Sequence, residues 1–324
     1  MNRSSGQMES SDINGRPRVS VGDLAEVDGF ASARAILAQW VTIGLAAAAA
    51  LWVDAWWSYL LAIATIATRQ HALLVLMHDG AHRLLARGRT VNDMASDLLL
   101  AFPLFLSTSL YRNHHFLHHH FLNSEADPDL ADSRESHGRA GWILVFLADV
   151  AGRGVFKLFR SGSDFSMLTY LTGGAEVRKS VPAWQFDLFL TTWAGAAALL
   201  TVTGGWPAFL LLWVLPMLTL LSLILHVRAV AEHAGCDPQP NVAGTRTVMP
   251  GAFERLLFAP VNVNYHLAHH LFPGVPAIRL ARLHARLCED PLFRRSAHVT
   301  EGYLLGRRSV LAEVAGAGEE GDGR

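Results

Sequence analysis

The chain has 324 residues, of which 51% are hydrophobic and only 17% are charged. A soluble globular protein carries about 25% charged residues, so the composition indicates a protein with a large surface that does not face water. The 27 Lys and Arg residues nearly balance the 28 Asp and Glu residues, which argues against a nucleic-acid-binding protein. Two cysteines exclude a disulfide framework and a cysteine-ligated zinc module, whereas the 16 histidines require an explanation.

Uncharged apolar runs predict an all-α integral membrane protein with about four transmembrane helices. Residues 35–53 form a run of 19 residues without a charge, close to the ~20 residues that cross a hydrocarbon core of about 30 Å. Residues 56–77 form a second run. Residues 188–227 lack charge and are interrupted by TGGWP at 203–207, which predicts two helices joined by a tight turn. Residues 98–111 are apolar but short, so we expect a re-entrant or interfacial segment there.

The distribution of Lys and Arg predicts the orientation of these spans. The two hairpin tips, residues 54–57 and 203–206, contain neither residue type, and 26 of the 27 lie in the N-terminal arm, the central loop or the C-terminal region. We therefore expect both termini and the central loop to be cytoplasmic, in a bacterial cell membrane. The expected organisation is a disordered cytoplasmic arm over residues 1–30, a single membrane domain over 31–311 and a disordered tail over 312–324.

Most histidines fall into short groups at the predicted cytoplasmic ends of the spans. In HDGAH, His78 and His82 are four residues apart, so both can point at one ion from the same helix face. The pattern HxxHH occurs twice and places three imidazoles on one side of a helix. Its members are His115, His118 and His119, and again His266, His269 and His270.

This wealth of imidazole predicts a metal site. Imidazole suits iron, zinc, copper and nickel, and the number of grouped histidines exceeds the four ligands of a structural zinc. Two metal ions, each with four or five nitrogen ligands, fit the number of grouped histidines better than one ion does. An all-nitrogen di-iron site can activate dioxygen for attack on an unactivated C–H bond, which side chains alone cannot perform.

Together these motifs resemble the membrane-bound fatty acid desaturase superfamily, which also contains hydroxylases. The matching elements are HDGAH at 78–82, HFLHH at 115–119 followed by Asn123 and DPD at 127–129, AEH at 231–233 and HLAHHLFPGVP at 266–276. The resemblance covers roughly residues 35–290 and implies a di-iron centre carried on a cytoplasmic helical cap. The metal ligands it implies are His78, His82, His115, His118, His119, His233, His266, His269 and His270.

Two features depart from the family pattern. Ala268 stands where family members often carry glutamate; the resemblance implies that this position is not a ligand, so the change affects the surroundings of the metal site and not metal binding. The histidine motif around residues 115–119, the second histidine box of the family pattern, has two additional histidines beside it, His114 and His120. The spacing to Asn123 favours His115, His118 and His119 as the ligands from this box. We expect His114 and His120 to support the ligands or to lie on the surface.

Polar residues near the boxes are candidate partners of the ligands, because metal-bound imidazoles usually donate their second N–H to a carboxylate or carbonyl. Arg112 and Arg228 could orient these acids. Arg69 lies nine residues before His78, about 13 Å along the helix, and charged groups at membrane depth usually mark function, so it is a candidate for a structural role or for substrate binding. The candidate partners of the ligands are Asp79, Asn123, Asp127, Asp129, Glu232, Asn262 and Asn264.

These observations predict an O2-dependent desaturase with two iron ions that introduces a C=C bond into a lipid acyl chain. The chain has no GxGxxG dinucleotide fingerprint, and the resemblance implies an external electron donor, a ferredoxin or a cytochrome b5-like protein with its reductase. Hydroxylation on the same scaffold, and desaturation of a polar metabolite that is not a fatty acid, stay open because the boxes describe the metal and not the substrate. The alternative from another class is a non-catalytic metal transporter or haem protein. A transporter would place its ligands near mid-membrane, unlike these boxes.

Overall fold

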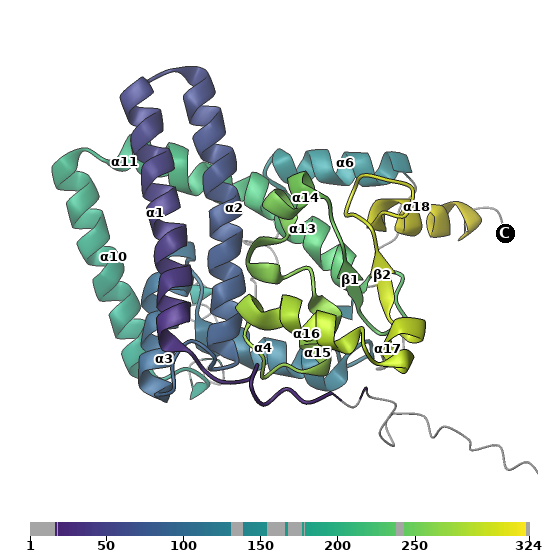
Figure 1. Ribbon diagram of the computed structural model, residues 1–324. Coiled ribbons are helices and arrows are strands. Elements are labelled where there is room, and N and C mark those ends of the chain that lie inside the picture. The colour runs from purple at the N-terminus through teal and green to yellow at the C-terminus, as the bar shows by residue number, and fades with distance from the viewer. Residues whose placement is uncertain are drawn as a thin grey trace, which may run out of the picture.

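The computed structural model describes residues 17, 19–130, 139–153, 166, 167, 177, 179–237 and 243–321. Four helices are long and apolar enough to span a membrane: Gly29–Val53 (α1), Trp56–Ala81 (α2), Ala183–Thr203 (α10) and Trp206–His233. The predicted all-α membrane fold is therefore confirmed. The fourth span is built from α11 (Trp206–Phe209), a π-turn (Leu210–Val214), α12 (Leu215–Leu218) and α13 (Leu220–His233). In Figure 1 the shorter elements that follow the fourth span gather on the side of α2 that faces away from α10.

Local sequence signals explain where the spans begin and end. The Asp28 carboxylate accepts a hydrogen bond from Ala31 N–H (3.0 Å) and so caps the start of α1. Gly204, with φ of +66°, ends α10 because glycine adopts the left-handed conformation without strain. Trp52 and Trp56 are 87% and 75% exposed beside the α1–α2 turn, a position that suits aromatic side chains at a membrane–water interface.

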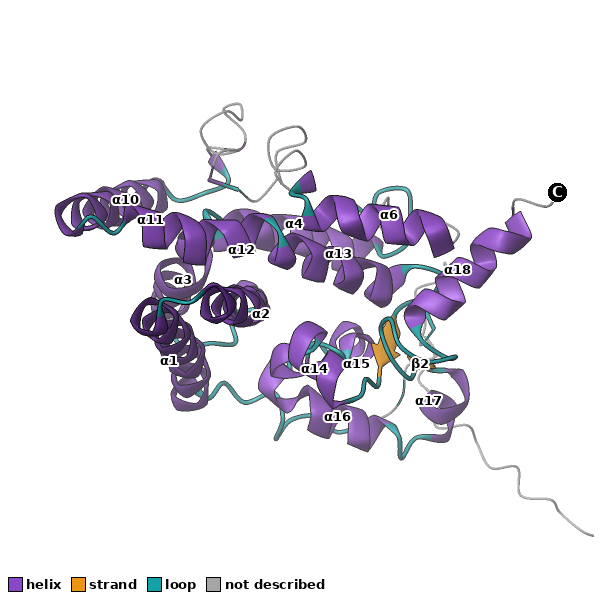
Figure 2. Cartoon of the chain, turned by 90° about the horizontal axis from the view of Figure 1, so that it is seen from above, coloured by secondary structure: helices purple, strands orange, loops and turns teal. Residues whose placement is uncertain are grey.

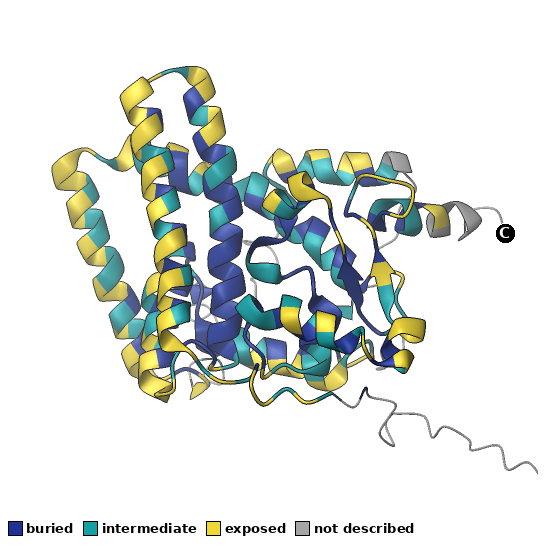
Figure 3. Cartoon of the chain, viewed as in Figure 1, coloured by how far each residue is buried: buried dark blue, intermediate teal, exposed yellow. Residues whose placement is uncertain are grey.

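α2 is the central helix of the fold. Within its most apolar window 61% of residues are buried, against 22% in α1 and 6% in α10, and Figure 3 shows its lower half as almost wholly buried. Gly80 lets α3 (Arg89–Ser96) lie directly against the end of α2, because a Cβ at Gly80 would lie 2.2 Å from Ser96 Oγ. Asn92 of α3 also donates to the Gly80 carbonyl (2.8 Å). This close contact holds the end of α2 that carries His78.

The segment expected to be re-entrant or interfacial is irregular and largely buried. It runs through a π-turn (Asp97–Ala101) and a 3-10 turn (Phe102–Leu104) before α4 (Thr108–Phe121). The indole N–H groups of Trp193 and Trp213 donate to the carbonyls of Phe102 (3.0 Å) and Pro103 (2.9 Å). The third and fourth spans thus satisfy backbone groups that the irregular turns leave free.

The remaining elements form a compact group against α2 and α13, seen at the right of Figures 1 and 2. β1 and β2 pair in parallel, with Arg246 opposite His298. 3-10 turns at Pro260–Asn262 and Ala277–Arg279 link some of the helices. The elements are α6 (Arg139–Val150), β1 (Arg246–Val248), α14 (Ala252–Phe258), α15 (His266–Leu271), α16 (Leu280–Leu287), α17 (Pro291–Ser296), β2 (His298–Thr300) and α18 (Val310–Gly321).

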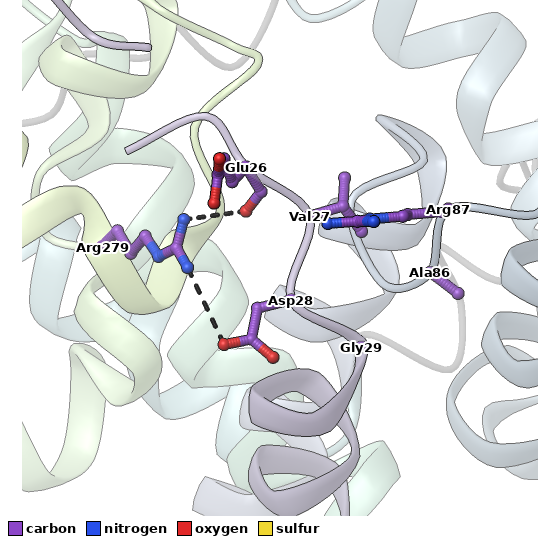
Figure 4. A pocket seen from close by; sticks show the side chains of 7 residues that line it. All are labelled: Glu26, Val27, Asp28, Gly29, Ala86, Arg87 and Arg279. Atoms are coloured by element: carbon purple, nitrogen blue, oxygen red, sulfur yellow. Dashed lines mark hydrogen bonds and ion pairs between the residues drawn. The ribbon is translucent and has the colours of Figure 1, made fainter. Parts of the chain in front are cut away.

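The N-terminal arm differs from the expected disordered segment over its second half. Residues 1–16 and 18 lie outside the described residues. The arm that follows is held by two arginines: Arg286 binds both carboxylate oxygens of Asp23 (2.7 and 2.9 Å), and Arg279 donates to the Glu26 carbonyl (2.8 Å). Figure 4 shows the contact of Arg279 with Glu26 at a pocket of about 410 Å³ between the arm and Arg87. Both partners lie more than 250 residues away along the chain, so local composition does not reveal them.

The expected disordered tail also begins as ordered structure, because α18 extends to Gly321. The Arg246 side chain is fully buried and donates to the carbonyls of Ala231 (2.9 Å) and Ala234 (2.7 Å) at the end of α13. It also donates to the Glu313 carboxylate of α18 (2.6 Å), which lies 2.9 Å from His298 Nε2. These polar contacts fasten α18 to the end of α13.

We expect this attachment to weaken at alkaline pH. Hydrogen bonds with Cys236 and Glu313 raise the pKa of His298 from 6.5 to about 9, so the folded chain favours the charged imidazole. Its stabilising contribution is complete below pH 6.5 and is lost as the pH rises through about 9. The apparent melting temperature should therefore fall across this range, and His298→Gln should flatten the fall. His120→Gln, which changes an exposed histidine, should keep the wild-type slope; an unchanged slope in His298→Gln would contradict the assignment.

Candidate metal centre

Nine histidines converge from the ends of α2, α4, α13 and α15, and they separate into two clusters. In each cluster, one nitrogen from every ring lies within 4.8 Å of the others. Cluster A consists of His78, His82, His115, His119 and His269, and cluster B consists of His118, His233, His266 and His270. The nine residues are the same nine that the family resemblance implied.

Each HxxHH motif contributes to both clusters. In α4, His115 and His119 point into cluster A while His118 points into cluster B. In α15 the assignment is reversed: His266 and His270 belong to cluster B, and His269 belongs to cluster A. Residues four apart lie about 40° apart around a helix, whereas residues three apart diverge by about 60° the other way. The sequence spacing predicted that the three imidazoles of each motif lie on one side of a helix. It did not predict that they divide between two clusters.

The ring nitrogens within each cluster are in direct contact. In cluster A, His115 Nε2 lies 3.0 Å from His82 Nε2 and 2.9 Å from His119 Nε2. In cluster B, His266 Nε2 lies 3.0 Å from His233 Nε2 and 2.9 Å from His270 Nε2. A bound cation would accept the lone pairs that these nitrogens direct at one another.

Burial keeps the imidazoles neutral, which is the form that binds metals. Burial, reinforced by the Arg112 charge, lowers the pKa of His82 to about 4. Burial, reinforced by His82 and His118, lowers the pKa of His119 to about 3. Burial likewise holds the pKa of four other ligand candidates well below the usual 6.5: His115, His266, His269 and His270.

The donor set fits two metal ions. Five and four neutral nitrogens suit iron, zinc, copper or nickel, and the nine together exceed the four ligands of a single structural zinc. His78 Nε2 is buried and has no hydrogen-bond partner among the described residues, which is costly for a polar atom unless a ligand meets it. The arrangement is therefore compatible with a two-metal centre.

Carboxylates that the sequence analysis named lie beside two histidines of cluster B. His118 Nδ1 lies 2.9 Å from Asp127 Oδ1 and 3.5 Å from Asp129 Oδ2. Burial alone would raise the pKa of Asp127, but the hydrogen bond and attraction of His118, together with hydrogen bonds from the backbone of Asp129 and Asn123, outweigh burial and lower the pKa below its usual value. His266 Nδ1 lies 3.4 Å from Glu232, whose carboxylate is oriented by Arg228 (2.5 Å). These contacts fix the ring orientations.

The other predicted partners act on the backbone around the boxes. Asp79 accepts a hydrogen bond from Ala277 N–H (3.0 Å) and lies 4.0 Å from the His78 ring nitrogen. Asn123 donates to the carbonyls of Asp237 (3.1 Å) and Gly244 (2.9 Å). Asn264 donates to the Val248 carbonyl (2.9 Å), and Asn262 to that of Ala277 (3.2 Å). These side chains hold the loops that carry the ligands.

The histidines without a predicted ligand role have other positions. His114 contacts Asp129 (2.8 Å) and so supports the carboxylate behind His118, while His120 is exposed. His226 contacts Asp149 of α6 (2.6 Å). His71 is fully buried, His284 lies 3.5 Å from the Cys288 sulfur, His298 contacts Glu313, and His137 lies outside the described residues.

A cavity of about 430 Å³ joins the membrane spans to both clusters. Its apolar walls come from α2, the 104–106 turn and α12–α13, and its other end meets the two histidine clusters. Tyr111, which sequence reasoning missed, lines the cavity and stacks on His115 with 5.2 Å between ring centroids. The lining side chains are Leu74, Met77, Leu104, Phe105, Leu106, Met217, Leu218, Leu221 and Leu225 on the apolar side, and His115, His118, His233 and His266 at the clusters.

Arg69 does not line this cavity. It donates to the Gln39 side chain of α1 (3.1 Å) and to its neighbour Thr68 (3.3 Å). The described lining residues instead include another arginine, Arg228. The geometry therefore gives Arg69 a structural role between α1 and α2 and does not support substrate binding.

We expect Asp127→Asn to weaken metal retention. The change removes the charge that orients His118 and should reduce metal affinity about 10- to 100-fold, as loss of such a partner typically does. Metal bound per chain after dialysis against a graded chelator measures this effect. Glu125→Gln, which changes an exposed acid two residues away, should retain metal like the wild type. Equal retention in both variants would show that Asp127 does not support a ligand.

Comparison with known proteins identifies the family. A family model described as Fatty acid desaturase matches residues 54–300, which include all nine histidines. A dihydrorhizobitoxine desaturase of Bradyrhizobium elkanii is 29% identical over 80% of this chain and 77% of its own length. An sn-1 oleoyl-lipid 12-desaturase of Synechocystis is 28% identical, covering 67% of this chain and 64% of the relative. A Delta(5) fatty acid desaturase of Caenorhabditis elegans is 22% identical, covering 71% and 57%. The chain belongs to the fatty acid desaturase family.

Proposed function

We propose that this protein is an O2-dependent di-iron desaturase that introduces a C=C bond into a lipid acyl chain. The observation that carries the proposal is the cavity of about 430 Å³ between the spans, which begins among leucine and methionine side chains and ends at both histidine clusters. Apolar walls favour a hydrocarbon chain and exclude water from the reacting carbons. Family membership supports an oxidoreductase of the desaturase or hydroxylase type.

Clusters A and B would each hold one iron ion. Bound iron would supply the O2 activation and C–H attack that protein side chains cannot perform. The chain itself supplies orientation: Asp127 and Glu232 hold the rings of His118 and His266, and Tyr111 stacks on His115 at the cavity wall. The apolar walls position the hydrocarbon chain beside these ligands.

The proposed reaction requires an external electron donor. Conversion of –CH2–CH2– and O2 into –CH=CH– and two water molecules consumes two further electrons and two protons. Because the sequence has no GxGxxG fingerprint, we propose that a ferredoxin, or a cytochrome b5-like protein with its reductase, supplies the electrons. We place both termini and the clusters on the cytoplasmic side of a bacterial cell membrane, because the Lys and Arg residues concentrate there.

A second candidate substrate is a metabolite that is not a fatty acid. The relative from Bradyrhizobium elkanii is named for dihydrorhizobitoxine and not for a lipid. The cavity also has a polar side, where Arg228, Glu232 and Asp129 lie beside the histidines. Such a wall could bind the polar part of a small substrate while its carbon chain occupies the apolar end.

Expression in a host of known composition, followed by mass spectrometry of lipids and small metabolites, tests the reaction directly. A lipid species lighter by two hydrogens is expected with the wild type and absent with His269→Ala. His120→Ala, which alters an exposed neighbour of the ligands, should retain most of the activity. A product heavier by one oxygen would identify hydroxylation, and a dehydrogenated small metabolite with unchanged lipids would favour the second candidate.

A narrower test concerns the cavity. Met217 lines its apolar end, away from the histidines, so Met217→Trp should fill it and reduce turnover of a long-chain substrate at least tenfold while leaving iron content unchanged. Leu210 lies in the same span but is 53% exposed on its outer surface, so Leu210→Trp is the matched control and should be neutral. Equal turnover in both variants would show that the substrate does not use this cavity.

A further inference from the structure

α14 and the loop after β2 expose large apolar side chains although neither belongs to a span. On and beside α14, Phe253 is 65% exposed, Leu256 59% and Met249 38%. In the loop, Leu305 is 62% exposed. Single exposed apolar residues are common, but a group of four on two neighbouring segments forms the kind of patch that marks an interaction surface. We call residues 249–258 and 301–309 the α14 platform.

The two segments of the platform are locked together. Glu254 of α14 is buried, and its carboxylate accepts hydrogen bonds from the backbone N–H groups of Leu304 (2.7 Å) and Leu305 (2.9 Å), and from that of Tyr303 (3.1 Å). A Cβ at Gly302 would lie 2.7 Å from the same carboxylate, so glycine is needed for this approach. The loop is therefore held in a fixed shape that directs Leu305 outward beside α14.

Contacts with the spans set the depth of the platform along α2. The backbone of Leu257 lies beside the His71 ring, and Phe258 shares a buried apolar cluster with Ala67. His71 and Ala67 precede the cluster A residue His78 by 7 and 11 residues, about 10 and 16 Å along the helix. α14 thus contacts α2 at a level that lies between the histidine clusters and the hairpin tip.

That contact level lies within the expected hydrocarbon core. Trp57, 48% exposed, marks the end of α2 at the hairpin tip. About 20 helical residues cross a core of about 30 Å. Counted from Trp57, this stretch ends at Leu76. Ala67 and His71 both fall inside this stretch. The exposed face of α14 therefore lies at a level where lipid, and not water, surrounds the protein.

Two further observations agree with a lipid environment. α6 packs on α13 and in Figure 1 lies at about the height of α14, and it exposes Ile143 (57%), Leu144 (68%) and Leu147 (60%). The tip of the platform loop also carries two exposed arginines, Arg307 and Arg308, of which Arg308 pairs with Glu301 of the same loop (2.8 Å). Cations next to an apolar surface suit the boundary between hydrocarbon and anionic phospholipid headgroups.

We propose that the α14 platform inserts into the membrane leaflet on the histidine side, with Phe253, Leu256 and Leu305 in hydrocarbon and Arg307 at the level of anionic headgroups. The four spans then are not the only membrane-embedded part of the protein. The platform fastens the group of short helices to the bilayer at a fixed height. Because it packs against α2 and α13, it also fixes the depth of the histidine clusters that these helices carry.

Spin labels report depth directly. In a Cys236→Ser, Cys288→Ser background, single cysteines at Leu305 and Phe253 are labelled in nanodiscs of phosphatidylcholine and phosphatidylglycerol at 7:3. Collision with O2 should exceed collision with a water-soluble nickel chelate at least threefold at both positions. Leu45→Cys, on the exposed face of α1, is the lipid control, and Glu289→Cys, on the exposed turn between α16 and α17, is the water control. Labels at Leu305 and Phe253 that behave like the one at Glu289 would overturn the proposal.

A second measurement avoids replacing the cysteines. Benzoylphenylalanine at position 305 or 253 of the otherwise unchanged chain should crosslink to phospholipid on illumination in the same nanodiscs, and mass spectrometry detects the adduct. Position 289 should give no lipid adduct. A lipid adduct at position 45 but none at positions 305 and 253 would overturn the proposal. This result would hold even if the cysteine-free chain failed to fold, because the crosslinking chain keeps both cysteines. Neither measurement depends on iron content or on desaturase activity, so it stands apart from the proposed function.

Discussion

The Nε2 atoms of His115 and His119 lie 2.9 Å apart in cluster A, and those of His266 and His270 lie equally close in cluster B. A neutral imidazole has one N–H and one lone pair, so four or five rings directed at one point cannot satisfy every nitrogen by bonding to one another. Two cations would satisfy both groups at once. The tight approach of α3 at Gly80, the carboxylates behind His118 and His266 and the burial of the rings all keep this arrangement fixed.

The two clusters have different surroundings, which has a chemical consequence. Described ligands of cluster B contact carboxylates: His118 contacts Asp127, and His266 contacts Glu232. In cluster A, the Asp79 carboxylate lies farther away, 4.0 Å from His78, and His115 and His82 contact the aromatic rings of Tyr111 and Phe116. A carboxylate behind an imidazole raises the basicity of the ligand. An ion in cluster B would therefore have the more electron-rich ligands, and the two metal positions would be inequivalent although both are built from imidazole alone.

Much of this fold could be predicted from the sequence because its signals are local. Charge-free runs predict the four spans, and i, i+3 and i, i+4 spacing predicts which histidines share a helix side. The resemblance then supplied His233, which spacing alone does not. What could not be predicted depends on contacts between distant residues. The division of each HxxHH motif depends on where the other helices stand, and the ordered arm and α18 are held by Arg286 and Arg246 from remote segments. The partner of Arg69, Gln39, likewise lies on another span, so its contact could not be predicted from local sequence.

The central claim is that the nine histidines hold two iron ions, and metal analysis of the purified chain tests it most directly. Elemental analysis combined with Mössbauer spectroscopy of protein grown on iron-57 measures both the amount and the state of the metal. We expect about two iron ions per chain, with two resolved iron environments that reflect clusters A and B. One iron ion per chain, or a site occupied mainly by zinc, would contradict the di-iron centre and the desaturase chemistry proposed from it.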